Sequence, residues 1–259
     1  MASQKKSNGA AKNMTVDVLI CTKNSDIQFR ETIVLDKCFE AIKKEIPYEN
    51  IILVDAFSID KTVEKAEEYF NDRLVLIESS EKLGKARQIG FENSKADWIF
   101  VIDSDVVVPE NIWNMIETLT EKSLTENSPF RYDAIECDAI NFYPSGKIED
   151  SRRRKRGILC ATLIKRKFLD GINIPSDLEV YEDDFIKRYL TSKGGRWFPS
   201  DIKVIHYPKE ITPLTAQKVG YLSGKYRMKS FFTVLGGLIR FHDRIYFSQF
   251  KGWIKGRMI

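Results

Sequence analysis

Two aspartates interrupt an apolar stretch of the sequence, VIDSDVVVP, which runs from Val101 to Pro109. Asp103 and Asp105 flank Ser104, and two ionised carboxylates in such surroundings cost free energy unless a cation binds them. Oxygen ligands favour Mg²⁺ or Mn²⁺ over Zn²⁺, and an ion held by one or two carboxylates keeps positions open for phosphate oxygens. The pair therefore predicts a divalent-metal site, although a solvated turn between a strand and a helix has the same composition.

The elements that would position these aspartates form an alternating pattern of short apolar runs and longer amphipathic ones. We predict strands at 16–21, 51–54, 74–77 and 98–102, and helices at 29–44, 60–69, 84–94 and 110–121. This order implies right-handed crossovers and an α/β fold, with a mostly parallel, Rossmann-like central sheet that is flanked by helices.

Polar side chains follow three of the predicted strands, at the end where parallel sheets bind their ligands. These side chains are Thr22, Lys23 and Asn24 after the first strand, Asp55 and Ser58 after the second, and Asp103, Ser104 and Asp105 after the fourth. We therefore expect the three strand ends to meet at one site.

The pattern changes after about residue 127. Further strands are predicted at 134–142, 158–164 and 203–207, and a helix that ends in glycine at 182–194. The loop before residue 158 carries a basic run, 152–156, which is either solvated or a grip for a diphosphate or a phosphorylated acceptor. Thr212 and Pro213 are typical of a helix start and begin a helical tail.

Four segments of the chain occur in an order that is specific in combination. They are CTKN at 21–24, VDAFSIDKT at 54–62, LGKARQIGFENSKADWIFVIDSD at 83–105 and EDDFIKRYLTSKG at 182–194, and His206 follows them. Together they resemble the family-two glycosyltransferases, which are inverting nucleotide-sugar enzymes of the GT-A fold. The resemblance covers roughly residues 16–208. It departs at Ala56 and Phe57, where the family pattern has an aspartate and a glycine, so we expect the usual contact to the nucleotide base to be altered. It also departs at Gln88, where asparagine is common, and at Asp97, where glycine is common.

The resemblance implies a role for each matching residue. The donor would be a UDP- or GDP-sugar, bound by Thr22 and Asp55 around the base, by Lys85 and Arg87 near the ribose and diphosphate, and by Asp103 and Ser104 near the ribose and sugar. Asn24 would also bind the nucleotide-sugar. Asp103, Asp105 and His206 would hold Mn²⁺ or Mg²⁺. Asp183 would be the base that takes the proton from the hydroxyl of a glycan or lipid-linked acceptor.

Other interpretations of these residues stay open. Glu182, Asp183 and Asp184 also suit the positive end of a helix, and a lone histidine such as His206 is often a packed one. The DxD pattern also occurs in haloacid-dehalogenase-type phosphatases, where it usually follows the first strand of the core. A further alternative is a non-catalytic protein that binds a sugar or a nucleotide.

The remaining expectations concern the ends of the chain and its location. Residues 1–13 are expected to be a disordered tail, 14–211 the GT-A domain and 212–259 a basic, aromatic-rich helical extension. That extension carries a net charge of +8, against +4 for the whole chain, so membrane-surface contact or packing is expected and nucleic acid is not. Four widely spaced cysteines and the lack of an apolar spanning segment favour a cytoplasmic protein, peripheral on the cytoplasmic face of the membrane.

Overall fold

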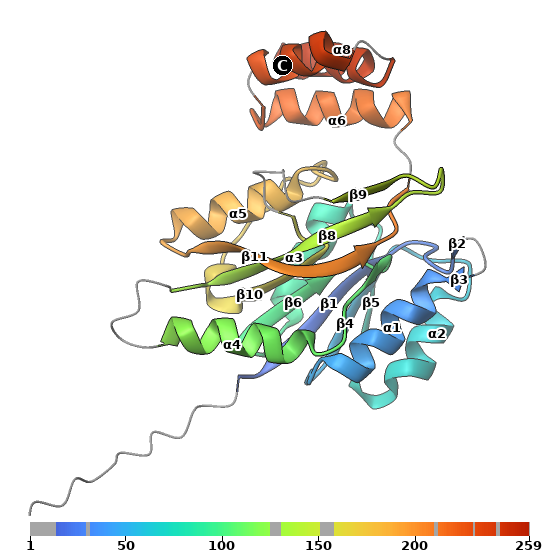
Figure 1. The fold of residues 1–259 in the computed structure, drawn as a ribbon, viewed down its shortest axis with the longest axis vertical. Coiled ribbons are helices and arrows are strands. Elements are labelled where there is room, and N and C mark those ends of the chain that lie inside the picture. Colours follow the sequence, from blue (N-terminus) through green and yellow to red (C-terminus); the bar gives the residue numbers. More distant parts are fainter. Residues whose placement is uncertain are drawn as a thin grey trace, which may run out of the picture.

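The computed structural model describes residues 14–29, 32–124, 131–150, 158–209, 212–229, 231–241 and 244–258. The expected disordered tail, 1–13, and the basic run, 152–156, lie outside the described residues. One large sheet forms the centre of the molecule, in the strand order β5-β4-β1-β6-β10-β8-β11-β7, with β9 paired to β8 (Figure 1). Helices cover both of its faces, which confirms the predicted α/β architecture.

The first half of the sheet is parallel. Its strands are β5 (Leu74–Glu78), β4 (Ile51–Asp55), β1 (Val16–Thr22) and β6 (Trp98–Ile102). All five residues of β4 and all five of β6 are buried, as expected for parallel strands that helices cover on both faces. The carboxyl ends of these strands therefore open at one edge of the sheet.

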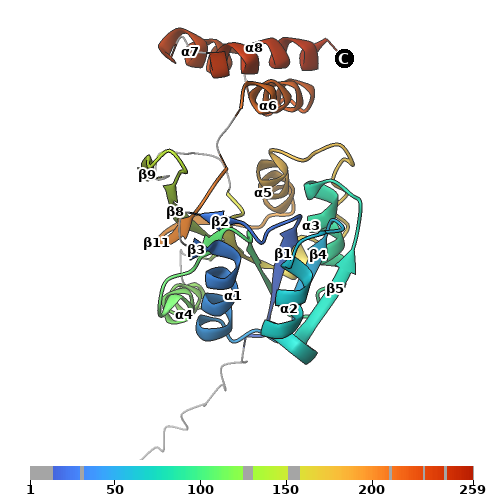
Figure 2. The same cartoon turned by 90° about the vertical axis from the view of Figure 1, so that its right-hand side faces the viewer.

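Two hydrophobic cores lie on opposite faces of this sheet. Alternate residues of β1 divide between them, with Val18 in one core and Leu19 in the other. The first core packs under α1 (Val34–Glu45), α2 (Thr62–Phe70) and α4 (Ile112–Leu124), and the second under α3 (Leu83–Asn93) and α5 (Glu182–Ser192) (Figure 2). The four cysteines are free, and Cys38, Cys137 and Cys160 are buried.

The second half of the sheet mixes strand directions. It consists of β10 (Ala161–Lys165), β8 (Ala134–Phe142), β11 (Trp197–His206), β7 (Val106–Val107) and β9 (Ile148–Asp150). β10 is antiparallel to both β6 and β8, whereas β11 runs parallel to β8. The short 3-10 helices η1 (Asn71–Arg73) and η2 (Arg166–Phe168) connect other elements.

Two predicted starts were wrong by five residues or more. The helix expected from residue 29 begins at Val34, because β2 (Gln28–Phe29) and β3 (Thr32–Ile33) form a small hairpin before it. The Phe29 ring packs on Tyr207 at 4.9 Å between centroids, a tertiary contact that the helical spacing could not show. The strand expected from residue 203 begins earlier, at Trp197, and its pairing with β8 shifts register between Pro199 and Lys203.

The predicted helical tail consists of α6 (Pro213–Lys225), α7 (Phe231–Phe241) and α8 (Arg244–Arg257). The Thr212 side chain caps α6, since its Oγ1 accepts a hydrogen bond from the Thr215 amide at 3.2 Å. α6 and α8 pack against each other above the body of the molecule, with α6 nearer the sheet (Figures 1 and 2). None of the described helices is long and apolar enough to cross a bilayer.

Candidate active site

The ends of β1 and β4 are tied together by a hydrogen-bond network. Asp55 is fully buried, and its carboxylate accepts hydrogen bonds from Thr22 Oγ1 at 2.7 Å, Ser58 N at 2.7 Å and Ser58 Oγ at 2.6 Å. The Asn24 amide donates to Ser58 Oγ at 2.7 Å, and Asn24 Oδ1 accepts from the Ile59 amide at 2.9 Å. Thr22, Asn24 and Asp55 thus lie together, as the strand pattern predicts, and they brace the loop between them. The contact of Thr22 and Asp55 with a nucleotide base, and of Asn24 with the nucleotide-sugar, stays a prediction.

The loop that Asp55 braces contains an exposed aromatic residue in an unusual backbone conformation. Phe57 has a φ of +52°, in the left-handed region, and it occupies the position where the family pattern has glycine. A side chain there costs about 1–2 kcal/mol. The departure seen in the sequence therefore lies on a strained turn beside the predicted base pocket.

A buried arginine links the fourth strand end to the start of α5. Arg87, on α3, donates to Glu182 Oε1 at 2.6 Å and to Asp103 Oδ1 at 2.8 Å. Burial alone would lower the pKa of Arg87, but the carboxylates of Glu182 and Asp103 raise it above its usual value. Burial also raises the pKa of Glu182 to about 7, although Arg87 opposes this shift. Arg87 therefore stays charged and positions both acids.

Glu182 was missed as a site residue by the sequence reasoning, which assigned it to the helix end. It is the buried member of the three acids that open α5. Nothing in the letters EDD distinguishes the residue that faces the core. A buried arginine is rare unless it is paired, but Arg87 could not be recognised as buried before α3 was placed against the sheet.

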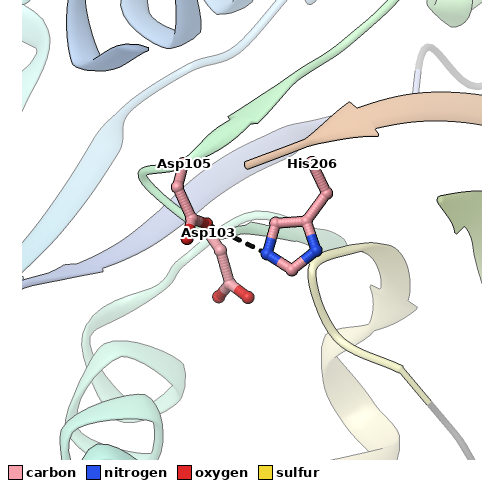
Figure 3. Close-up of side chains that lie close together, drawn as sticks. All are labelled: Asp103, Asp105 and His206. Atoms are coloured by element: carbon pink, nitrogen blue, oxygen red, sulfur yellow. Dashed lines mark ion pairs between the residues drawn. The ribbon is translucent and has the colours of Figure 1, made fainter. Parts of the chain in front are cut away.

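Asp103, Asp105 and His206 form a cluster that fits a divalent metal ion. One ligand atom from each of the three lies within 4.8 Å of the others. His206 Nε2 is 3.3 Å from Asp105 Oδ1, as the dashed line in Figure 3 shows. On its other side, the imidazole Nδ1 is 2.8 Å from Asn141 Oδ1, an acceptor that favours a proton on Nδ1 and a lone pair on Nε2. Two carboxylates and an imidazole nitrogen directed this way suit Mn²⁺ or Mg²⁺.

Asn141 is a second residue that sequence reasoning missed. It lies on β8 directly opposite His206, on the parallel neighbour β11. No signal in the sequence pairs the two, because their contact depends on the register of strands that are more than sixty residues apart.

Two cavities open beside this cluster. The first has a volume of about 360 Å³, and Arg87, Asp103, Glu182, Asp183 and His206 are among its lining residues. The second has a volume of about 400 Å³, and its lining includes Ser104 and Asp105 as well as Asp103. Asp183 therefore borders the same cavity as Asp103 and His206, and the cluster lies between the two cavities.

Other predicted site residues have different surroundings. Lys85 points its Nζ at Asn173 Oδ1, 2.9 Å away, and at Gln88 Oε1, 3.1 Å away, and it does not line either cavity. Ser104 Oγ donates to Ser25 Oγ at 2.9 Å, which ties the DxD turn to the loop after β1. The contact of Lys85 with a diphosphate stays a prediction, and it would require Nζ to leave both partners.

A comparison with protein families matches these same elements. The profile of glycosyl transferase family 2 covers residues 17–166, from the start of β1 to the end of β10. The chain belongs to this family. The match contains the braced loop, Arg87 and the DxD turn, whereas Asp183 and His206 follow it. No curated protein is similar enough in sequence to be matched as a relative.

Solved structures share the fold of most of this chain. S. aureus TarS is 15% identical, with a TM-score of 0.59, over 84% of this chain and 40% of TarS. TarS 1-349 in complex with UDP-GlcNAc is 12% identical, with a TM-score of 0.60, over 94% of this chain and 79% of that one. TarS 1-349 in complex with UDP is 15% identical, with a TM-score of 0.55, over 81% of this chain and 64% of that one. The chain thus spans less than half the length of the full TarS chain.

Proposed function

We propose that this protein is a metal-dependent, inverting glycosyltransferase that moves a sugar from a nucleoside diphosphate to a hydroxyl group. One observation carries the proposal: Asp183 lines the same cavity as Asp103 and His206, so a base and a metal-binding cluster face one space. Family-two membership supports the reaction class. A UDP-sugar is the first donor to test, since TarS has been solved with UDP and with UDP-GlcNAc, and a GDP-sugar is the second.

The residues of the chain divide the work between donor and acceptor. Arg87 holds Asp103 in place and adds positive charge beside the departing diphosphate. Asp183 accepts the proton of the acceptor hydroxyl as that oxygen attacks the anomeric carbon. A single displacement of this kind inverts the anomeric centre. The acceptor is the hydroxyl of a glycan or of a lipid-linked molecule.

Asp103, Asp105 and His206 would hold the metal ion, Mn²⁺ or Mg²⁺. When bound, such an ion neutralises negative charge that develops on the leaving diphosphate. Asn141 supports this role because it orients the His206 ring.

We further propose that the protein works in the cytoplasm, peripherally on the cytoplasmic face of a membrane. Four free cysteines support a reducing compartment. The basic tail supports contact with an anionic surface.

The test is a thermal-shift comparison of nucleoside diphosphates with and without Mn²⁺, because a ligand that binds only the folded state raises its stability. We expect UDP or GDP with Mn²⁺ to raise the melting temperature, and Asp105→Asn to remove the Mn²⁺-dependent part of the rise. Asp170→Asn is the matched control, since Asp170 is exposed and pairs only with Arg166 among described basic residues. No response to any nucleotide, together with phosphate release from simple phosphate esters, would overturn the proposal in favour of a phosphatase.

A further inference from the structure

The outer face of α8 carries a stripe that mixes basic and apolar side chains. Its residues recur three or four positions apart along the helix and directly after its end, and all are exposed: Arg244, Phe247, Lys251, Ile254, Lys255 and Met258. Phe247 is 59% exposed and Met258 is 81% exposed, values that are high for large apolar side chains. We call these six residues the α8 stripe.

The packing of α8 on α6 does not need this stripe. The two helices approach so closely that a Cβ added at Gly220 would lie 1.9 Å from the Gln249 carbonyl oxygen. A Cβ at Gly252 would lie 1.9 Å from the carbonyl oxygen of Gln217, and one at Gly256 would lie 2.0 Å from that of Tyr221. Backbone packing through small residues is the mode that helices use where larger apolar side chains face lipid. These glycines form the contact between α6 and α8, so the larger apolar side chains of α8 are left facing outward. We call α6, α7 and α8 together the helical hairpin.

The charged side chains of the helical hairpin are all basic. No acidic residue occurs in the sequences of α6, α7 or α8. Two bases of α6 attach the hairpin to the body, Lys218 to Glu179 and Lys225 to Asp177. Within the described part of the chain, no carboxylate pairs with Arg244, Lys251 or Lys255. The bases of the α8 stripe are therefore available to an external anion.

We propose that the α8 stripe docks the protein on a membrane surface that contains anionic lipids. A helix whose apolar side chains enter the headgroup region while its bases meet lipid phosphates has this composition. A second copy of the chain fits poorly, because two stripes of like charge would face each other. Nucleic acid would account for the bases but leave Phe247, Ile254 and Met258 without a role.

Docking through α8 would also orient the active site. Val219 of α6 lines the 360 Å³ cavity together with Asp183. The hairpin therefore joins that cavity to the docked face. This step rests on the proposed function, and it assigns a lipid-linked molecule as the acceptor. The docking itself does not depend on catalysis.

The experiment is co-sedimentation of the full chain with sucrose-loaded vesicles, without nucleotide or metal. One set contains phosphatidylcholine alone, and the other adds about 30% phosphatidylglycerol. The two basic residues of Arg244→Gln/Lys251→Gln and the two apolar residues of Phe247→Ser/Ile254→Ser are exposed, so both variants are expected to fold. The matched control is Lys37→Gln/Lys43→Gln, which removes the same charge from exposed positions of α1, on the opposite side of the body (Figure 1).

We expect binding to the anionic vesicles, weakened about 30-fold by Arg244→Gln/Lys251→Gln and unchanged by Lys37→Gln/Lys43→Gln. Phe247→Ser/Ile254→Ser should weaken it about tenfold or more. The proposal would be overturned if Lys37→Gln/Lys43→Gln weakened vesicle binding as much as Arg244→Gln/Lys251→Gln does. It would also be overturned if the protein bound neither kind of vesicle. So would binding to single-stranded RNA that vesicles cannot displace. Because no donor is present, failure here would leave the glycosyltransferase proposal intact, and a failure of nucleotide binding would leave the docking proposal intact.

Discussion

Removing the Arg87 guanidinium should lower the stability of the folded protein, because Arg87 pairs with two acids of the site. Side-chain exposure is 3% for Arg87 and 8% for Glu182, so their ion pair is buried, whereas Asp103 is 31% exposed. Loss of one partner of a buried pair leaves an uncompensated charge and costs about 3–5 kcal/mol. We therefore expect Arg87→Met to lower the free energy of unfolding by that amount near pH 8.

The charge of Glu182 gives this cost a defined pH dependence. Its pKa is about 7 in the folded protein, so Glu182 is ionised near pH 8 and protonated near pH 5. Arg87 lowers that pKa, hence Arg87→Met raises it further, and the lost ion pair matters only where Glu182 would be charged. The destabilisation by Arg87→Met should thus be larger near pH 8 than near pH 5.

A double-mutant cycle measures the pair itself. Glu182→Gln leaves Arg87 paired with Asp103 and should cost about 1–3 kcal/mol. The double variant Arg87→Met/Glu182→Gln should then lose less than the sum of the single losses, by about 2 kcal/mol. The assay is urea unfolding followed by tryptophan fluorescence, with the slope checked for each variant.

Arg188→Met is the matched control for this cycle. Arg188 is 53% exposed and pairs with Asp184 at 2.8 Å, so its loss should cost less than about 1 kcal/mol. An Arg87→Met loss no larger than the Arg188→Met loss, or strict additivity in the double variant, would refute the buried-pair reasoning.

Two other predictions concern the fold around the site. Glu136 accepts a hydrogen bond from Trp197, and burial raises the pKa of Glu136 to about 7. Its contribution to the stability of the folded protein is therefore fully present below the pKa of the unfolded state and is lost as the pH rises through 7. The free energy of unfolding of the wild type should therefore fall between about pH 5 and pH 8, and that of Glu136→Gln should fall by about 2–3 kcal/mol less. Denaturant titrations of both proteins at the two pH values measure this difference. Gly220→Ala, whose Cβ would meet the Gln249 carbonyl, should lower the melting temperature, whereas Gly236→Ala, with no atom within 4 Å of the added Cβ, should raise it slightly. Equal melting temperatures for the two alanine variants, or equal pH profiles for Glu136→Gln and the wild type, would contradict these expectations.

The alternating half of the fold was largely predictable from the sequence. Buried parallel strands read as continuous apolar runs, so 51–54 and 98–102 agree with β4 and β6 within one residue. The N-cap of α6 was also readable, as Thr212 shows. The start of α1 could not be predicted. The apolar residues from Phe29 on have helical spacing, but Gln28 and Phe29 pair with later residues in a small hairpin instead.

The site was predictable only where strand ends determine it. Asp55 ends β4 and Asp103 follows β6, two strands of the parallel half of the sheet, so topology alone brings them to one edge. Glu182 and Asn141 were missed because their contacts depend on helix packing and strand register. The role of Lys85 stays a prediction, since a motif position carries no information about which way a flexible side chain turns.

The most direct test of the account is the turnover of Asp183→Asn measured beside its nucleotide affinity. UDP release from UDP-GlcNAc, with water or an added sugar as acceptor, reports turnover, and titration of UDP with Mn²⁺ reports binding. Asp184→Asn is the control, since Asp184 is the next residue of α5 and pairs with Arg188. We predict that Asp183→Asn keeps UDP affinity and loses about 10²–10⁴-fold in turnover, while Asp184→Asn keeps both. Unchanged turnover in Asp183→Asn would contradict the assignment of Asp183 as the base that faces the metal cluster.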